Sequence, residues 1–251
     1  MFLEGVLGYS ALHTGVVLLS IALGTLLAGG ATPELARAVG ARGVARLGLV
    51  FEVVGLVGLG VVVSATVNVW LLVPWLAAYG IGLGMASAQL LGVILSEVPT
   101  VHSGQASGIQ STNRQVGSAF GIAVLGTIFA TEIGSRTASA VRAIVGVSSA
   151  TARQVAGIVR ASGGATIHPL ARFPHGHALM VAASGAVADA TRFVSLIGAV
   201  FIAVGLVGTL LLQKAAASDG DRENGDLVSG DLGTPSGGEN PAPAASLPAA
   251  D

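Results

Sequence analysis

Long apolar runs are the feature of this sequence that most restricts its fold. Residues 193–212 contain no charged side chain, and residues 12–28 contain none apart from the titratable His13. A helix of about 20 apolar residues crosses the hydrocarbon core of a bilayer. Because every backbone polar group must be satisfied inside the membrane, runs of this length form helices rather than open sheets. We therefore expect an all-α membrane protein.

Run length predicts five spanning helices, at residues 12–28, 47–67, 70–95, 105–130 and 193–212. Residues 131–189 form a connection rich in Ala, Ser and Gly, in which short apolar groups near Val141 and Val155 predict amphipathic helices at the membrane interface. Residues 214–251 are acidic and rich in Gly, Pro and Ala, so they lack the apolar area for a core and are expected to be disordered. The domains expected are thus a transmembrane bundle, 1–213, and a tail, 214–251.

Composition excludes several classes of function. Apolar residues make up 52% of the chain and charged residues 10%, against about 25% charged in a soluble domain. The net charge of -1 argues against a nucleic-acid partner, and the lack of cysteine excludes disulfides and thiolate metal sites. His175 and His177 have no suitably spaced further ligand, so no metal site is expected. No catalytic set of Ser, His and Asp and no pair of carboxylates is present, so we expect neither an enzyme nor a cofactor.

Basic and aromatic residues indicate an orientation. The connection between the first two spans carries Arg37, Arg42 and Arg46, and the positive-inside rule places it in the cytoplasm. The N-terminus and the long connection at 131–189 are then outside the cell, and the tail is inside. The arginines of the 131–189 connection oppose the positive-inside rule, but long loops obey that rule poorly. The third span begins with residues typical of an interfacial aromatic belt, Trp70, Trp75 and Tyr79.

The polar start of the fourth span is the most informative stretch. Gly104 and Gly108, and further on Gly117 and Gly121, recur at four-residue spacing, which allows another membrane helix to approach closely. Arg114 would lie ~15 Å along the helix from Gly104, where a guanidinium must face protein or water. These features predict a helix that faces the inside of an assembly. The alternative is that Arg114 extends to the cytoplasmic interface.

Three other polar residues lie within the expected spans. Glu52 is five residues into the second span and has either a proton-coupling role or a structural role at the lipid interface. Gln89 lies in the middle of the third span, where it can hydrogen-bond a substrate or a neighbouring helix. Gln110 shares a helical face with Arg114 and is a second candidate for lining a substrate cavity.

Several stretches resemble one family of transporters. They are residues 2–15, 40–42, 95–99 and, most specifically, 104–126. They are similar to the C-terminal part of major facilitator superfamily transporters, and most of all to the bacterial drug:proton antiporters with fourteen helices. The resemblance implies a multi-pass protein of the bacterial inner membrane that exchanges small amphipathic compounds for protons. It also implies that the helix containing Arg114 packs against the N-terminal half of the transporter.

The sequence departs from the complete family pattern in two ways. It matches five helices, which is most of the six-helix C-terminal bundle, and it lacks the N-terminal half with its proline-glycine antiporter signature. The loop at 30–43 resembles the family's short cytoplasmic motif but has Arg37 where an aspartate is usual. We therefore expect an incomplete transporter whose partners are membrane lipid, a missing N-terminal half, a small-molecule substrate and the proton. The alternative is a membrane scaffold or partner-binding protein that does not transport.

Overall fold

The computed structural model describes residues 2–96 and 99–230, with side chains described except at 90–96, 100 and 212–230. Over these residues the chain is helical and contains no strand. It divides into two units, Met1–Gly208 and Thr209–Asp251. The described part of the second unit, residues 209–230, is helical.

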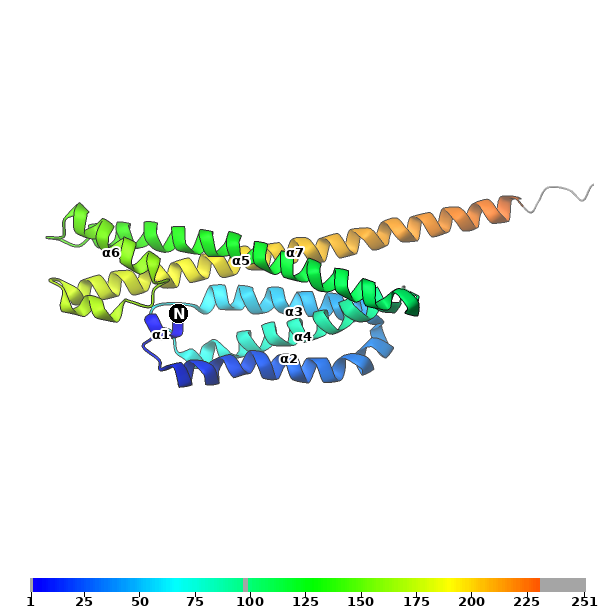
Figure 1. Cartoon of the computed structure of the whole chain (residues 1–251), viewed down its shortest axis with the longest axis horizontal. Coiled ribbons are helices and arrows are strands. Elements are labelled where there is room, and N and C mark those ends of the chain that lie inside the picture. Colours follow the sequence, from blue (N-terminus) through cyan, green and yellow to red (C-terminus); the bar gives the residue numbers. More distant parts are fainter. Residues whose placement is uncertain (1, 97–98, 231–251) are drawn as a thin grey trace, which may run out of the picture. The chain divides into compact units, whose positions relative to one another are not determined.

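Figure 1 shows the helices in chain order. They are α1 (Phe2–Gly5), α2 (Ala11–Val39), α3 (Ala41–Val62), η1 (Val69–Leu71), α4 (Val73–Ser96), η2 (Thr100–His102), α5 (Ser103–Arg142), α6 (Ser149–Ala161), η3 (His168–Arg172) and α7 (Gly176–Gly230). Within the described residues, five helical segments are long and apolar enough to cross a membrane: α2, α3, Val69–Gln89, α5 and Gly176–Leu211. The prediction of an all-α membrane protein with five spans is therefore confirmed.

The first span is longer than predicted, because α2 continues through Pro33 to Val39. A proline inside a helix removes one hydrogen bond and displaces the carbonyl four residues earlier, which can bend a helix without ending it. Figure 1 shows this bend towards the C-terminal end of α2. Gly40 alone joins α2 to α3, with a left-handed φ of 77° that glycine adopts readily. The predicted arginine loop is therefore a pair of helix ends.

Close backbone contacts pack α4 against both α2 and α3. A Cβ atom added at Gly84 would lie 2.5 Å from the Thr25 carbonyl oxygen of α2, and one added at Gly82 would lie 2.6 Å from the backbone nitrogen of Glu52 in α3. The Thr25 hydroxyl also donates a hydrogen bond to the Gly80 carbonyl oxygen, at 3.0 Å. Small residues and hydrogen bonds across helices are the usual basis of helix association in membranes.

Two of the three expected belt residues contact α3. A Cβ atom added at Gly58 would fall within the Trp75 ring, and one added at Gly55 would lie 2.7 Å from the Tyr79 backbone nitrogen. Trp75 and Tyr79 are four residues apart and therefore share one face of α4. Of the three aromatic residues, Trp70 is the exposed one, at 68%. The belt interpretation does not describe Trp75 and Tyr79, which serve helix packing.

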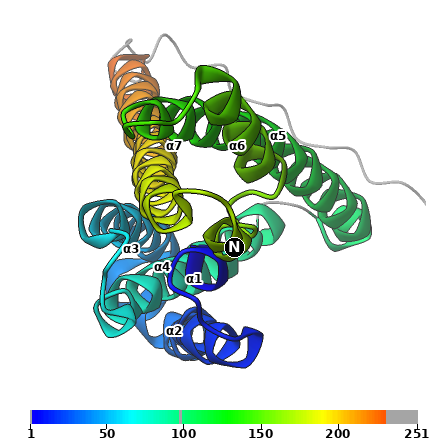
Figure 2. The same ribbon diagram turned by 90° about the vertical axis from the view of Figure 1, so that its left-hand side faces the viewer.

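The connection between the fourth and fifth spans is a folded helical unit, which we call the cap (residues 131–190). α5 extends past the predicted end at 130 to Arg142, and α7 begins at Gly176 rather than at 193. Figure 2 shows α6 alongside α5 and α7. Residues of these extensions, of α6 and of η3 share one apolar core with Val6, which follows α1. Its buried residues are Val6, Ile133, Val141, Ala152, Val155, Val159, Ile167, Leu170, Leu179, Ala183, Val187 and Ala190.

The amphipathic helix α6 buries its apolar side in protein. Ala152, Val155 and Val159 are at most 6% exposed and belong to the cap core. The ends of α5 and α7 supply the apolar surface on which α6 packs, and the expected position of α6 at the membrane interface stays a prediction. Arg136 of α5 pairs with Glu132 at 2.7 Å, and its guanidinium lies 5.7 Å from the centre of the Phe193 ring of α7.

The last helix also differs from the prediction. α7 is helical as far as Gly230, so residues 214–230 of the expected disordered tail are helical, while residues 231–251 lie outside the described part of the chain. Lys214 is followed by three alanines, and both residue types favour a helix. Extending the spanning helix through residues 214–217 adds a hydrogen bond for each residue that is fixed, while residues 218–230 contain few residues that favour a helix.

Candidate functional site

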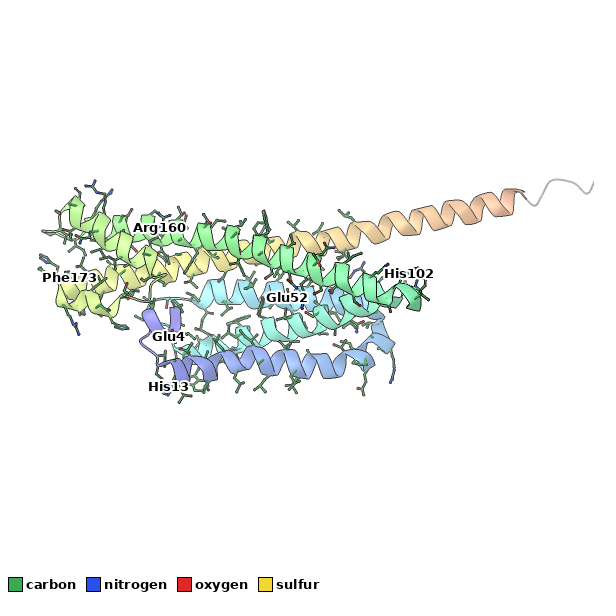
Figure 3. All side chains as sticks on the ribbon, in the orientation of Figure 1. Glu4, His13, Glu52, His102, Arg160 and Phe173 are labelled. Carbon is green, nitrogen blue, oxygen red and sulfur yellow. The ribbon has the colours of Figure 1, made fainter. Side chains whose placement is uncertain are left out.

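Glu52 lies further along its helix than the sequence predicted. α3 begins at Ala41, so Glu52 falls near the middle of its 22 residues, about 16 Å along the helix axis. The predicted start at 47 was wrong because the helix begins directly after the turn at Gly40. Figure 3 shows Glu52 at mid-length on α3. Glu52 is therefore not near the end of its helix, and the choice between a proton-coupling role and a structural role stays a prediction.

The Glu52 side chain faces α4. It is 8% exposed, and a Cβ atom added at Gly82 would lie 2.7 Å from its Cγ. A carboxyl group in the middle of a span is costly unless it is neutral, paired or close to water, and for that reason it usually has a function. Its position between two helices means that a change in its charge would act directly on the α3–α4 contact.

Gln89 of α4 is also buried. It is 9% exposed and lies seven residues after Gly82, which puts both on one face of α4. Gly82 contacts α3, so Gln89 lies on the side that packs within this chain. This burial favours a hydrogen bond to a neighbouring helix over contact with a substrate.

The four candidate glycines of α5 have no close neighbours among the described residues. A Cβ atom added at Gly104, Gly108, Gly117 or Gly121 would have no atom within 4 Å outside its local helix. Glycines on α4, by contrast, contact other backbones directly, as Gly82 does. The spacing of the α5 glycines is therefore not used for packing inside the described part of this chain.

The polar half of α5 is also uncovered. Asn113, Arg114 and Gln115 are exposed and Gln110 is partly buried. A shallow groove runs along the same helix and is lined by Gln105, Gly108, Ile109, Thr112 and Asn113. Polar and charged side chains on a spanning helix face protein or water rather than lipid. This surface of α5 therefore requires a covering partner or an aqueous cavity.

The candidate residues thus form two separate groups. The four glycines, Gln110 and Arg114 lie on α5, while the two buried residues Glu52 and Gln89 lie on α3 and α4. The sequence reasoning did not identify the glycines that pack the bundle, although Gly80, Gly82 and Gly84 alternate along α4. That alternation was a usable signal, because it puts small residues on the two sides that face α2 and α3.

Within residues 2–96 and 99–230, no group of three His, Cys, Asp or Glu side chains could hold a metal ion.

Parts of the chain match curated transporters. A stretch of 72 residues is 38% identical to the "Probable actinorhodin transporter" of Streptomyces coelicolor, covering 29% of this chain and 12% of that protein. A stretch of 129 residues is 31% identical to "Multidrug resistance protein Stp" of Mycobacterium tuberculosis, covering 51% of this chain and 24% of that protein. A stretch of 127 residues is 31% identical to "Multidrug efflux pump LfrA" of Mycolicibacterium smegmatis, covering 51% of this chain and 25% of that protein. These relatives are transporters.

The similarity supports a membrane protein with a transport function, and these relatives are not named as enzymes. The matched stretches span between 12% and 25% of the relatives' lengths, so the activity of a whole transporter does not transfer to this chain by similarity alone. The chain matches no family model and no solved structure.

Proposed function

We propose that this chain is the C-terminal portion of a proton-coupled exporter of small amphipathic compounds. It would belong to the fourteen-helix drug:proton antiporters of the major facilitator superfamily. The observation that carries the proposal is the uncovered face of α5, where polar side chains and unpacked glycines lie on a helix long enough to cross a membrane. The names of the relatives, two of which describe multidrug resistance or efflux, agree with this substrate class.

The partner of the α5 face is an N-terminal transporter half. Gly108 and Gly117 are nine residues apart and so lie on opposite sides of α5, and each would allow a helix of that half to approach the α5 backbone closely. Arg114, exposed on the same helix, would then lie between the halves, where a guanidinium can contact protein or cavity water. Gln110 would line that cavity, and rocking of the two halves would open it to each side in turn.

Glu52 is the proposed proton-coupling residue. Its carboxyl group would be neutral when protonated and charged when the proton leaves, and it is buried at the contact of α3 with α4. Burying the charged form costs free energy. Loss of the proton would therefore weaken this helix contact, and so link proton release to a change in the bundle.

The proposed location is the bacterial inner membrane, with the junction of α2 and α3 in the cytoplasm. Arg37, Arg42 and Arg46 flank that junction, and the positive-inside rule counts charges near the ends of spans. The cap then lies outside. Its arginines carry little weight against this orientation, because long segments and folded domains are translocated largely regardless of charge.

The test is a chimera in which this chain replaces the matching C-terminal region of LfrA. We expect the chimera to restore efflux of a fluorescent cation in a host that lacks its own exporter, and Arg114→Ala to remove that efflux without preventing membrane insertion. A chimera that inserts but never exports, next to an active LfrA control, would contradict the exporter proposal. It would favour the alternative, a membrane scaffold or partner-binding protein without transport.

A further inference from the structure

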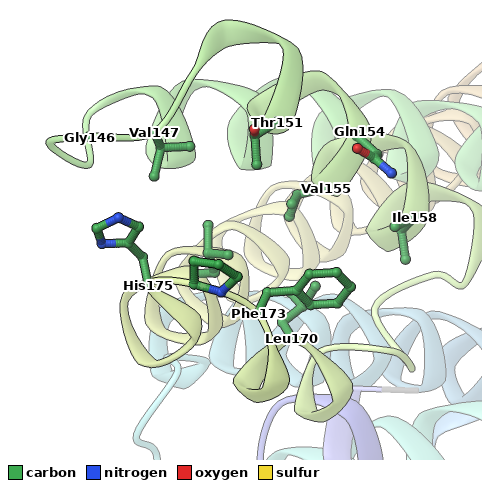
Figure 4. A pocket seen from close by; sticks show the side chains of 11 residues that line it. Gly146, Val147, Thr151, Gln154, Val155, Ile158, Leu170, Phe173 and His175 are labelled. Carbon is green, nitrogen blue, oxygen red and sulfur yellow. The ribbon is translucent and has the colours of Figure 1, made fainter.

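The cap contains a pocket that the export mechanism does not use. It lies between α6 and the η3–α7 connection (Figure 4) and has a volume of about 360 Å³. Pockets for small molecules typically measure about 300–1,000 Å³, so this one is large enough for a compact ligand. Figure 1 shows α6 and the adjoining ends of α5 and α7 reaching beyond the N-terminal end of α2. The pocket therefore lies in the cap, and none of its described lining residues belongs to α2, α3 or α4.

The floor of the pocket is part of the cap core. Val155, Leu170 and Leu179 line it and are at most 6% exposed, so their positions are fixed by packing on several helices. Ile158 and Phe173 form its open side and remain 38% and 54% exposed. Large apolar side chains gathered around a concavity are typical of sites for apolar ligands.

Three polar side chains lie at the edge of the cap pocket. Thr151 and Gln154 project from α6, and His175 lies across the pocket from them (Figure 4). None of the described lining residues is Asp, Glu, Lys or Arg. A phosphate headgroup or an organic cation would find no counter-charge here, and burying its charge would be costly. The chemistry therefore fits an uncharged molecule with one hydrogen-bonding group.

The backbone holds one end of the pocket in a strained shape. His175 has a left-handed φ of 62°, a conformation that is unfavourable for a residue with a side chain. Its ring lies 3.5 Å from the position of a Cβ atom at Gly146, and Gly176 packs directly on the Ala171 carbonyl group. Such strain persists only where the surrounding structure imposes it, and it is common at ligand sites.

From these observations we propose that the cap pocket binds a small, uncharged amphipathic molecule. The apolar body would lie on Val155, Leu170 and Phe173, and its polar atom would hydrogen-bond to the Gln154 amide. Binding at this site does not depend on export, because the lining residues belong to the cap alone.

Photolabelling of the full chain in lipid nanodiscs tests this site. The probe is benzophenone, an uncharged aromatic ketone whose oxygen can accept a hydrogen bond from Gln154. We expect saturable labelling within residues 146–179, mapped by mass spectrometry of the peptides, and competition by unlabelled diphenylmethanol. Labelling confined to the spanning helices would overturn the proposal.

Matched variants of α6 distinguish the pocket from nonspecific labelling. Gln154→Trp fills the pocket and should reduce labelling of residues 146–179 at least several-fold, while Arg153→Trp, at an exposed neighbour that does not line the pocket, should leave it unchanged. Ile158→Trp is a second filling variant, and labelling of the spanning helices is the internal reference for folding. Equal labelling in all three variants would also overturn the site.

Discussion

Glu52 places a carboxyl group halfway along α3, directly against the α4 backbone at Gly82. Because the contact is close, a replacement must keep the size of the side chain if it is to test charge alone. Glutamine meets this condition and cannot exchange a proton. The residue therefore allows the proton-coupling proposal to be separated from effects on packing.

Glu52→Gln in the LfrA chimera should leave membrane insertion intact and reduce proton-driven efflux to the level seen with an uncoupler. The reason is that the glutamine stays neutral and removes the proposed proton site. Efflux of the fluorescent cation measures the effect, and Glu34→Gln, at an exposed position near the end of α2, is the control. Wild-type efflux in Glu52→Gln would assign this carboxyl a structural role.

His175 provides a second test at the scale of one residue. At a φ of 62°, glycine fits without strain, whereas alanine keeps the steric cost of a Cβ atom of roughly 1–2 kcal/mol. We expect His175→Gly to be more stable than His175→Ala by roughly that amount. Thermal unfolding of the two variants in detergent measures the difference, and equal stability would mean that the turn relaxes to another conformation.

At the scale of helices, α4 and α5 use glycine differently. Each glycine at the centre of α4 meets the backbone of a neighbouring helix, whereas a side chain added at Gly108 of α5 enters open space. The same residue type therefore packs the bundle in one helix and leaves a free surface in the other. The consequence can be measured in this chain alone, without any partner.

Gly82→Ala should destabilise the isolated chain by about 1–3 kcal/mol, the usual cost of overpacking. Its new methyl group would lie 2.5 Å from the Gly48 carbonyl oxygen. Gly108→Ala should leave stability unchanged or slightly increased, because alanine favours a helix. Thermal unfolding in detergent compares the pair. A loss of stability in Gly108→Ala equal to that in Gly82→Ala would mean that α5 is already packed.

The sequence was sufficient to predict that five spans exist, because length and lack of charge decide whether a helix can cross a bilayer. It was less informative about where helices end. α5 and α7 extend through 131–142 and 176–192 because α6 covers their apolar sides in the cap core, which is a tertiary contact between distant segments. The depth of Glu52 was misjudged for a related reason, since the start of α3 depends on the turn at Gly40.

At the scale of the whole molecule, the cap and the α2–α3 junction mark the two ends of the spanning helices, and their sides of the membrane are testable. The chain has no cysteine, so single cysteines can be introduced without background. Arg153→Cys in the cap should react with a membrane-impermeant maleimide in intact cells, while Arg37→Cys near the junction should react only after lysis. The reverse pattern would invert the proposed orientation and put the cap in the cytoplasm.

The α5 face leads to the last prediction, which concerns assembly. If an N-terminal half docks on α5, added bulk at its uncovered glycines should hinder docking more than a volume-conserving change at an apolar position of the same helix. Gly108→Leu and Gly117→Leu should weaken co-purification with a co-expressed N-terminal half of LfrA, because both positions would hold the partner backbone at close range. Ile122→Leu, which keeps the volume at an apolar position that is 72% exposed, and the equivalent Ile128→Leu should change little.

Arg114→Ala completes the set, because it should impair efflux by the reconstituted pair while leaving insertion of the chain intact. The arginine is proposed to act between the halves rather than to stabilise its own helix. Equal co-purification of the glycine and isoleucine variants would refute the docking face on α5. Normal efflux by the Arg114→Ala pair would instead leave the docking face in place and assign Arg114 to the cytoplasmic interface, where a long side chain can reach water.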